Sequence, residues 1–109
     1  MHHWLFLGGA ILFEVAGTIS MKLSEGFTKL VPSILLFLFY LASFVLLTFA
    51  LKKIEVSIAY TIWAGVGIAL IAIIGIMYFK EAATATKFIS ILFIIIGVIG
   101  LSQMIYKPR

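Results

Sequence analysis

The segment GGAILFEVAGTISMK carries one carboxylic acid, Glu14, near the middle of an otherwise apolar run. An acidic side chain in such a place costs roughly 2.5–3.5 kcal/mol when the run crosses a lipid bilayer. The nearest cation along the chain is Lys22, eight residues away, or about 12 Å along a helix axis. An ion pair at membrane depth is therefore not available within the chain, and two interpretations of Glu14 are open.

In the first interpretation Glu14 is structural, stays protonated and hydrogen-bonds to a neighbouring helix. In the second it is functional, because removal from water disfavours the bare carboxylate and the group then holds either a proton or a cation. A carboxyl group that must be neutralised before it crosses the membrane couples two opposite fluxes, which is the chemistry of an exchanger. Intramembrane acids are functional far more often than merely structural, so we favour the second interpretation.

The residues on the helix face of Glu14 are small. Ala10, Gly17 and Thr18 stand four before, three after and four after the acid, which places them on its side of an α-helix. Small residues there leave room for a ligand, or they let another helix approach closely. The two interpretations do not exclude each other.

Aromatic residues recur in two other apolar runs. In FYLASF the residues Tyr40, Ser43 and Phe44 share one helix face, and in AYTIWAGVG the rings of Tyr60 and Trp63 share another. Aromatic faces attract cations by about 2 kcal/mol or more when water is excluded. We expect these residues to line a site for a hydrophobic amine beside the buried acid, with interfacial anchoring as the alternative for Tyr60.

Glycines mark two further positions. Gly65 and Gly67 are expected to form a conformational hinge, because glycine weakens a helix by roughly 1 kcal/mol relative to alanine, and simple close packing is the alternative. In SILFIIIG, Ser90 and Gly97 are two helical turns apart on one face, where we expect a contact between two chains. The sequence has no cysteine, no metal-ligand spacing and no nucleophile–base arrangement, so we expect no enzyme, no cofactor and no metal.

The elements that hold these residues must be apolar helices. Of the 109 residues 64% are hydrophobic and 11% are charged, whereas a soluble domain is about half apolar and a quarter charged. We therefore expect an all-α integral membrane protein, since a chain this short cannot bury so much apolar surface in one core. It would form a single four-helix transmembrane domain over residues 1–109, with spans at about 4–21, 30–51, 56–79 and 88–106.

Turn and capping signals separate the four spans. Pro32 suits the first turn of the second helix, and Thr84 or Thr86 can cap the fourth. The three other acids fall between the spans, where solvent and nearby lysines predict ordinary loop residues: Glu25, Glu55 and Glu81.

The basic residues are balanced across the membrane. Lys52, Lys53, Lys107 and Arg109 fall on one side of the four spans, against Lys22, Lys29, Lys80 and Lys87 on the other. The positive-inside rule then selects no orientation, so dual topology and an antiparallel dimer of one sequence are allowed; the alternative is that other factors, such as His2 and His3, tip the balance. The net charge of +4 lies at the span ends, beside lipid headgroups, and indicates no nucleic-acid binding.

Several stretches resemble the small multidrug resistance family of bacterial proton-coupled exporters over essentially the whole chain: GGAILFEVAGTISMKLSEGFTKLVPS, YLASF, AYTIWAGVG and GVIGL. The resemblance implies a multi-pass protein of the bacterial inner (plasma) membrane that forms an antiparallel homodimer through its fourth helix. Its two Glu14 side chains would form one site, where protons and an organic cation bind in turn and drive alternating access. The residues implied to surround that site are Gly17, Thr18, Tyr40, Tyr60 and Trp63.

Within that family, guanidinium exporters typically carry a Trp two residues after the central acid, where this chain has Ala16. Tyr40 also resembles the quaternary-ammonium exporters, so we expect export of quaternary ammonium and other lipophilic organic cations, as in multidrug and biocide efflux. The alternatives are guanidinium export and a subunit of a heteromeric pair, which the balanced lysines disfavour. The chain departs from the family pattern at Ser90, where Gly is usual, at Thr61, where Ala is usual, and in IEVSIAY, which lacks a Pro and a Gly.

Overall fold

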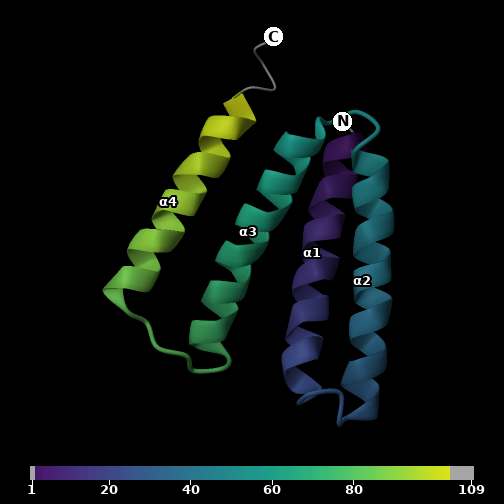
Figure 1. The fold of residues 1–109 in the computed structure, drawn as a ribbon, viewed down its shortest axis with the longest axis vertical. Helices are drawn as coiled ribbons and strands as arrows, with labels where there is room; N and C mark the ends of the chain where they lie inside the picture. Colours follow the sequence, from purple (N-terminus) through teal and green to yellow (C-terminus); the bar gives the residue numbers. More distant parts are fainter. Residues whose placement is uncertain (1, 104–109) are drawn as a thin grey trace.

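The computed structural model describes residues 2–103, in which four α-helices run alternately up and down (Figure 1). They are α1 (His2–Leu23), α2 (Leu30–Ala50), α3 (Val56–Met77) and α4 (Ala85–Ser102), and the described residues contain no strand. The first three are long and apolar enough to cross a membrane, and α4 is a shorter apolar helix. The prediction of an all-α membrane protein with four helices is confirmed. Pairing of two chains stays a prediction.

The helix ends differ from the predicted spans by a few residues. α4 begins before the predicted residue 88 because Thr84 caps it, with the Thr84 hydroxyl accepting a hydrogen bond from the backbone N–H of Lys87 at 3.1 Å. α3 ends at Met77 rather than at residue 79, because the chain turns at Lys80, whose φ of 59° is left-handed. The predicted end of the fourth span, at residues 104–106, lies outside the described residues.

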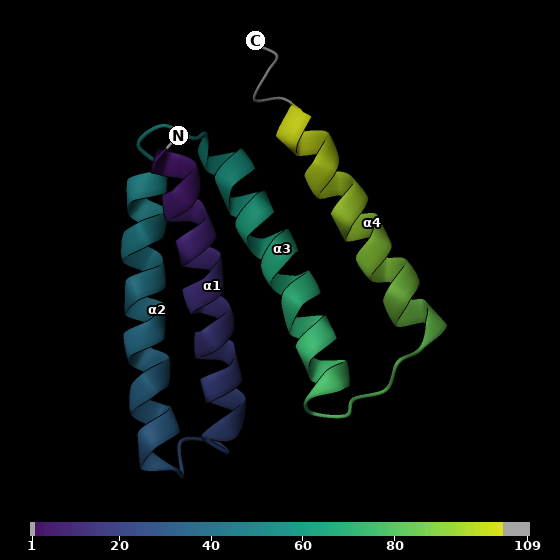
Figure 2. The same ribbon diagram turned by 180° about the vertical axis from the view of Figure 1, so that it is seen from behind.

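The helices lie side by side in one layer, in the order α4, α3, α1 and α2. Both views show this order, and the contacts agree with it, since α1 packs on α2 and α3 while α4 packs on α3 (Figures 1 and 2). The described chain measures 48 × 35 × 17 Å. A helix with its side chains is about 10–12 Å across, so the layer is little more than one helix thick and its apolar side chains project from both faces.

The buried core occupies one end of this layer. It brings together the first half of α1, the end of α2, the loop at residues 51–55 and the first turn of α3, and its buried members are Leu7, Ile11, Val15, Ala50, Ile54, Ile58 and Ala59. This is the end at which the N-terminus lies, and there α1 and α3 approach each other most closely (Figure 2). Toward the opposite end the packing continues through partly buried side chains such as Ile19 and Ile74, and a cavity opens between α1, α3 and α4.

Candidate functional site

Glu14 lies near the middle of α1, with its side chain half-buried against α3. A Cβ atom at Gly67 would stand 3.5 Å from Oε1 and 3.6 Å from Oε2 of Glu14, so the carboxyl group packs on the bare backbone of that glycine. Oε2 is buried and has no hydrogen-bond partner among the described residues. Buried polar atoms in folded proteins are nearly always paired, so this oxygen indicates that a ligand, a proton or a second chain completes the site.

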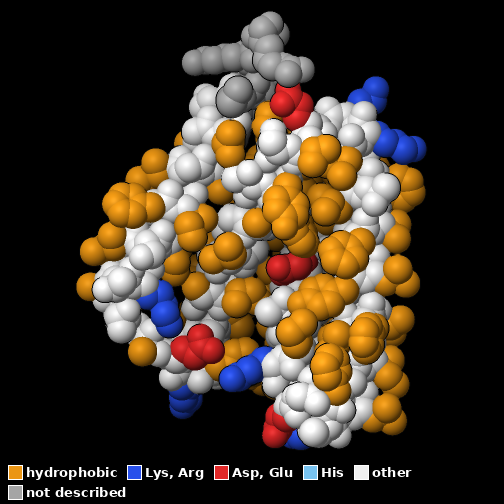
Figure 3. All heavy atoms as spheres, viewed as in Figure 1, with side chains coloured by type: hydrophobic (Ala, Val, Ile, Leu, Met, Phe, Trp, Pro, Cys, Tyr) orange, Lys and Arg blue, Asp and Glu red, His pale blue; other side chains and the backbone are white. Residues whose placement is uncertain are grey.

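The surroundings of this acid are apolar. On one face of the molecule an acidic group is surrounded by hydrophobic side chains, whereas the other charged groups visible there lie toward the two ends (Figure 3). Every other acid of the described residues lies outside the helices: Glu25, Glu55 and Glu81.

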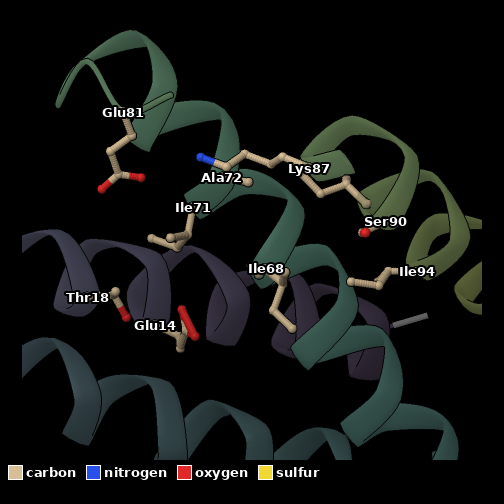
Figure 4. Close-up of a pocket in the computed structure, with 11 residues that line it drawn as sticks. Glu14, Thr18, Ile68, Ile71, Ala72, Glu81, Lys87, Ser90 and Ile94 are labelled. Carbon is tan, nitrogen blue, oxygen red and sulfur yellow. The ribbon is translucent and has the colours of Figure 1, made fainter. Parts of the chain in front are cut away.

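A cavity of about 510 Å³ opens beside the Glu14 carboxyl group, between α1, α3 and α4 (Figure 4). Small-molecule pockets typically measure roughly 300–1,000 Å³, so this cavity has the volume of a small-molecule site. The walls are mainly aliphatic, with Ile68, Ile71, Ala72, Ile91 and Ile94. The polar side chains in the lining are those of Glu14, Thr18, Glu81, Lys87 and Ser90.

Gly17 and Thr18 connect α1 to Tyr40 of α2. A Cβ atom at Gly17 would stand 2.9 Å from Cδ1 of the Tyr40 ring, so the ring rests directly on the glycine backbone. This approach brings the Tyr40 hydroxyl 2.7 Å from the Thr18 hydroxyl, and the two groups share a hydrogen bond. Because Thr18 also lines the cavity one helical turn from Glu14, three of the predicted residues are linked to the acid.

The four predicted aromatic residues form an aromatic row across α2 and α3, in the order Tyr40, Phe44, Trp63 and Tyr60. Successive ring centroids are 6.2, 6.4 and 5.3 Å apart. None of these rings lines the cavity beside Glu14, although Trp63 lies one turn before the glycine that touches the acid. Nε1 of Trp63 is buried and has no hydrogen-bond partner among the described residues. The structure thus groups the predicted aromatic residues with one another, adjacent to the cavity.

Ser43 and Ala10 lie elsewhere than the sequence led us to expect. Both are fully buried between α1 and α2, and the Ser43 hydroxyl donates a hydrogen bond of 2.7 Å to the Ala10 carbonyl oxygen. Neither lines the cavity beside Glu14. Their small side chains let the two helices approach closely, so in the single chain this pair fastens α1 to α2.

Gly65 and Gly67 lie within α3, which is helical from Val56 to Met77 without a break. Gly65 packs against Val98 of α4, where a Cβ atom would collide with the valine side chain. Both glycines therefore have close-packing roles in this conformation, and a hinge at this point stays a prediction.

The two residues of the predicted chain–chain contact lie on α4, and Ser90 also borders the cavity between α1, α3 and α4. Ser90 and Gly97 are exposed, and a Cβ atom at Gly97 would meet nothing within 4 Å. In the described part of the chain no residue of α4 with a described side chain is buried. A contact through this helix requires a second chain and stays a prediction.

Two charged residues of the cavity lining, Glu81 and Lys87, were missed from the sequence. Glu81 is exposed, as expected of a loop residue, but the chain folds back so that its backbone N–H donates to the Gly75 carbonyl oxygen at 2.9 Å. The one sequence signal for this return is Gly75 itself, since a glycine near a helix end permits close approach by another segment.

The sequence of the chain is similar to those of known membrane proteins. Residues 2–94 match the sequence model of the family described as Small Multidrug Resistance protein. An uncharacterized membrane protein of Bacillus subtilis, YvaE, is 56% identical over 100 residues, which cover 92% of this chain and 84% of the relative. The multidrug transporter EmrE of Escherichia coli is 46% identical over 99 residues, which cover 91% of this chain and 90% of the relative.

Proposed function

Because the chain belongs to the small multidrug resistance family, we propose that it exports quaternary ammonium and other lipophilic organic cations in exchange for protons. The 46% identity to a multidrug transporter supports a transport function. The transporter would act in the bacterial inner membrane, where a proton gradient is available to drive export.

The observation that carries this proposal is the unpaired Oε2 of Glu14 beside a cavity with aliphatic walls. A carboxylate in such a place is stable only when a proton or a cation neutralises it, because burial without a partner costs several kcal/mol. One carboxyl group cannot hold both partners at once. Binding of the substrate therefore releases the proton, and binding of a proton releases the substrate, which is the coupling that an antiporter needs.

The expected class of substrate follows from the side chains around the acid. Aliphatic walls favour alkyl and aryl groups. The rings of the aromatic row do not line this cavity, so cation–π attraction of about 2 kcal/mol would act only on a cation that also reached those rings. A quaternary ammonium ion suits such surroundings because it has no N–H group that must be hydrogen-bonded. A guanidinium ion carries several such donors, and the aliphatic walls of this cavity would leave them unpaired.

An antiparallel homodimer would complete the site. In a layer 17 Å thick, a cavity beside α1 and α3 has no wall on its outer side, and a second copy can supply that wall together with a second Glu14. The exposed α4 is a further surface that a partner can cover.

The test is proton release from detergent-solubilised protein when tetraphenylphosphonium or a tetra-alkylammonium ion is added at weak buffering. We expect release from the wild type and none from Glu14→Gln, whose amide has no proton to exchange. Glu55→Gln is the matched control, because Glu55 is an exposed acid that precedes α3 and its substitution should leave release unchanged.

Three results would contradict the proposal. They are equal release from Glu14→Gln, no release from the wild type with any cation, and greater proton flux with guanidinium than with tetra-alkylammonium in liposomes. The last result would favour a guanidinium exporter. Failure of the purified single chain to transport would favour a heteromeric pair.

A further inference from the structure

The carboxyl group of Glu81 is held at the end of α3 by Gly75. The Glu81 side chain lies against this buried glycine so closely that any Cβ atom there would collide with it. The backbone hydrogen bond of 2.9 Å between Glu81 and Gly75 fixes the loop in the same place. A loop acid is thereby turned toward the space between α3, α1 and α4, on the far side of the cavity from Glu14 (Figure 4).

Glu81 borders two neighbouring cavities. The first is the cavity of about 510 Å³ that Glu14 lines. The second measures about 140 Å³ and lies at the end of α1 and α3, where Lys22 is placed over the Phe79 ring. Both cavities are also lined by Thr18, one helical turn from Glu14. Glu81 and Thr18 therefore border both cavities between the loop at residues 78–84 and the buried acid.

The charges in the larger cavity give Glu81 a specific role. Its charged lining residues are Glu14, Glu81 and Lys87. In the proposed exchange Glu14 carries a proton and is neutral before substrate arrives. Without Glu81 the lining would then carry the positive charge of Lys87 alone and would repel a cation. The Glu81 carboxylate cancels that charge. The only salt bridge in the described part of the chain is that between Glu25 and Lys29, so Glu81 and Lys87 share the cavity lining without forming a salt bridge.

We infer that Glu81 forms an outer, low-affinity site for the organic cation at the cavity entrance, from which the cation moves inward to displace the proton on Glu14. This inference rests on the proposed function, since it concerns approach to the same acid. It assigns Glu81 to capture of the substrate, whereas Glu14 carries out the exchange.

The simplest alternative is that Glu81 only anchors the loop. Replacement by glutamine separates the two roles, because the amide keeps the size of the side chain and leaves the backbone hydrogen bond to Gly75 intact. An anchoring role predicts no dependence on ionic strength. A charge role predicts that the effect on KM weakens as ionic strength rises, because exposed charges are screened over about 10 Å at 0.1 M salt and over about 30 Å at 0.01 M.

The experiment measures initial rates of pH-driven uptake into proteoliposomes with tetraethylammonium and with the dication hexamethonium, at about 10 mM and about 500 mM salt. For Glu81→Gln we expect KM for the monocation to rise about fivefold at low salt, the factor that a unit charge about 4 Å away gives in water. The rise should be larger for the dication, whose second charge is also attracted although it stands farther from Glu81, and should nearly vanish at high salt, with the maximal rate little changed.

Two matched variants are measured beside Glu81→Gln. Glu25→Gln removes an exposed acid at the same end of the layer, outside the lining of either cavity, and should leave KM unchanged (Figure 1). Lys87→Gln removes the opposing charge from the lining and should lower KM at low salt. If Glu81→Gln does not insert or fold, Lys87→Gln still tests whether the charge of the cavity lining affects KM at low salt.

The results distinguish the role of Glu81 from the proposed transport function. Equal KM values for Glu81→Gln and Glu25→Gln at low salt, an effect that salt does not weaken, or an unchanged KM in Lys87→Gln would each overturn the role of Glu81. In all of those cases the wild type still exchanges cations for protons and Glu14→Gln does not. Absence of cation-driven proton flux in the wild type would instead overturn the proposed function, and this inference with it.

Discussion

Replacement of Gly17 by alanine should disrupt the contact between α1 and α2 that leads to the candidate site. A Cβ atom at this position would stand 2.9 Å from Cδ1, 3.0 Å from Cε1 and 3.3 Å from Cγ of Tyr40. Ordinary carbon–carbon contacts lie near 3.5–4.0 Å, so the tyrosine ring must move outward by several tenths of an ångström. Because the ring carries the hydroxyl that bonds to Thr18 at 2.7 Å, this hydrogen bond is stretched or lost.

The expected change in the free energy of unfolding has three contributions. Overpacking a close contact costs about 1–3 kcal/mol, and loss of the hydroxyl hydrogen bond costs about 1 kcal/mol. Alanine offsets part of this, because it is favoured over glycine within a helix by about 0.5–1 kcal/mol. We therefore expect Gly17→Ala to lower the free energy of unfolding by about 1–3 kcal/mol and to weaken substrate binding, since Thr18 lines the cavity.

Gly8→Ala is the matched control on the same helix. A Cβ atom at Gly8 would meet nothing within 4 Å, so this variant should be as stable as the wild type or more stable by up to about 1 kcal/mol. The assay is reversible unfolding in mixed micelles at one protein concentration, followed by tryptophan fluorescence, together with substrate titration of the folded protein. If Gly17→Ala proved as stable as Gly8→Ala and bound substrate equally well, the packing of Tyr40 on Gly17 would be refuted.

Two further predictions concern other contacts. Ser43→Ala removes the buried hydrogen bond to the Ala10 carbonyl oxygen and should lower the free energy of unfolding by about 0.5–1.5 kcal/mol without changing substrate KM, whereas a large rise in KM would return Ser43 to the lining of the site. The hydrogen bond and the charge of Lys29 hold the pKa of Glu25 below its usual value. A lowered pKa in the folded state stabilises the protein above the unfolded-state value of about 4.3 and stops doing so as pH falls through the folded-state value. The unfolding midpoint of Glu25→Gln should therefore lie slightly below that of the wild type at pH 7 and merge with it in acid, and a difference that grew in acid would contradict this.

The sequence predicted the four helices well, for a clear physical reason. Hydrocarbon thickness sets the length of an apolar run, so the four helices could be located within a few residues, and helical periodicity placed Gly17 and Thr18 on the face of Glu14. Those constraints act within one segment. They do not say which helix each face will meet.

The placement of Ser43 shows where this reasoning stops. Periodicity puts Ser43 on one face with Tyr40 and Phe44, but the close packing of α1 on α2 buries the serine while the two rings extend past the contact. Glu81 was missed for a different reason. Its approach to Gly75 depends on a left-handed turn at Lys80, with φ of 59°, and lysine gives no sequence signal for that conformation.

A layer little more than one helix thick leaves its cavity open on one side, so in the proposed homodimer the walls of the transport site would be shared between the two copies. In a pair of identical chains every substitution enters the binding chamber twice. A change that weakens binding by about 1.4 kcal/mol per copy, or tenfold, then acts about a hundredfold in the pair. The substrate range of such a transporter should shift in large steps through single mutations, with few intermediate specificities between them.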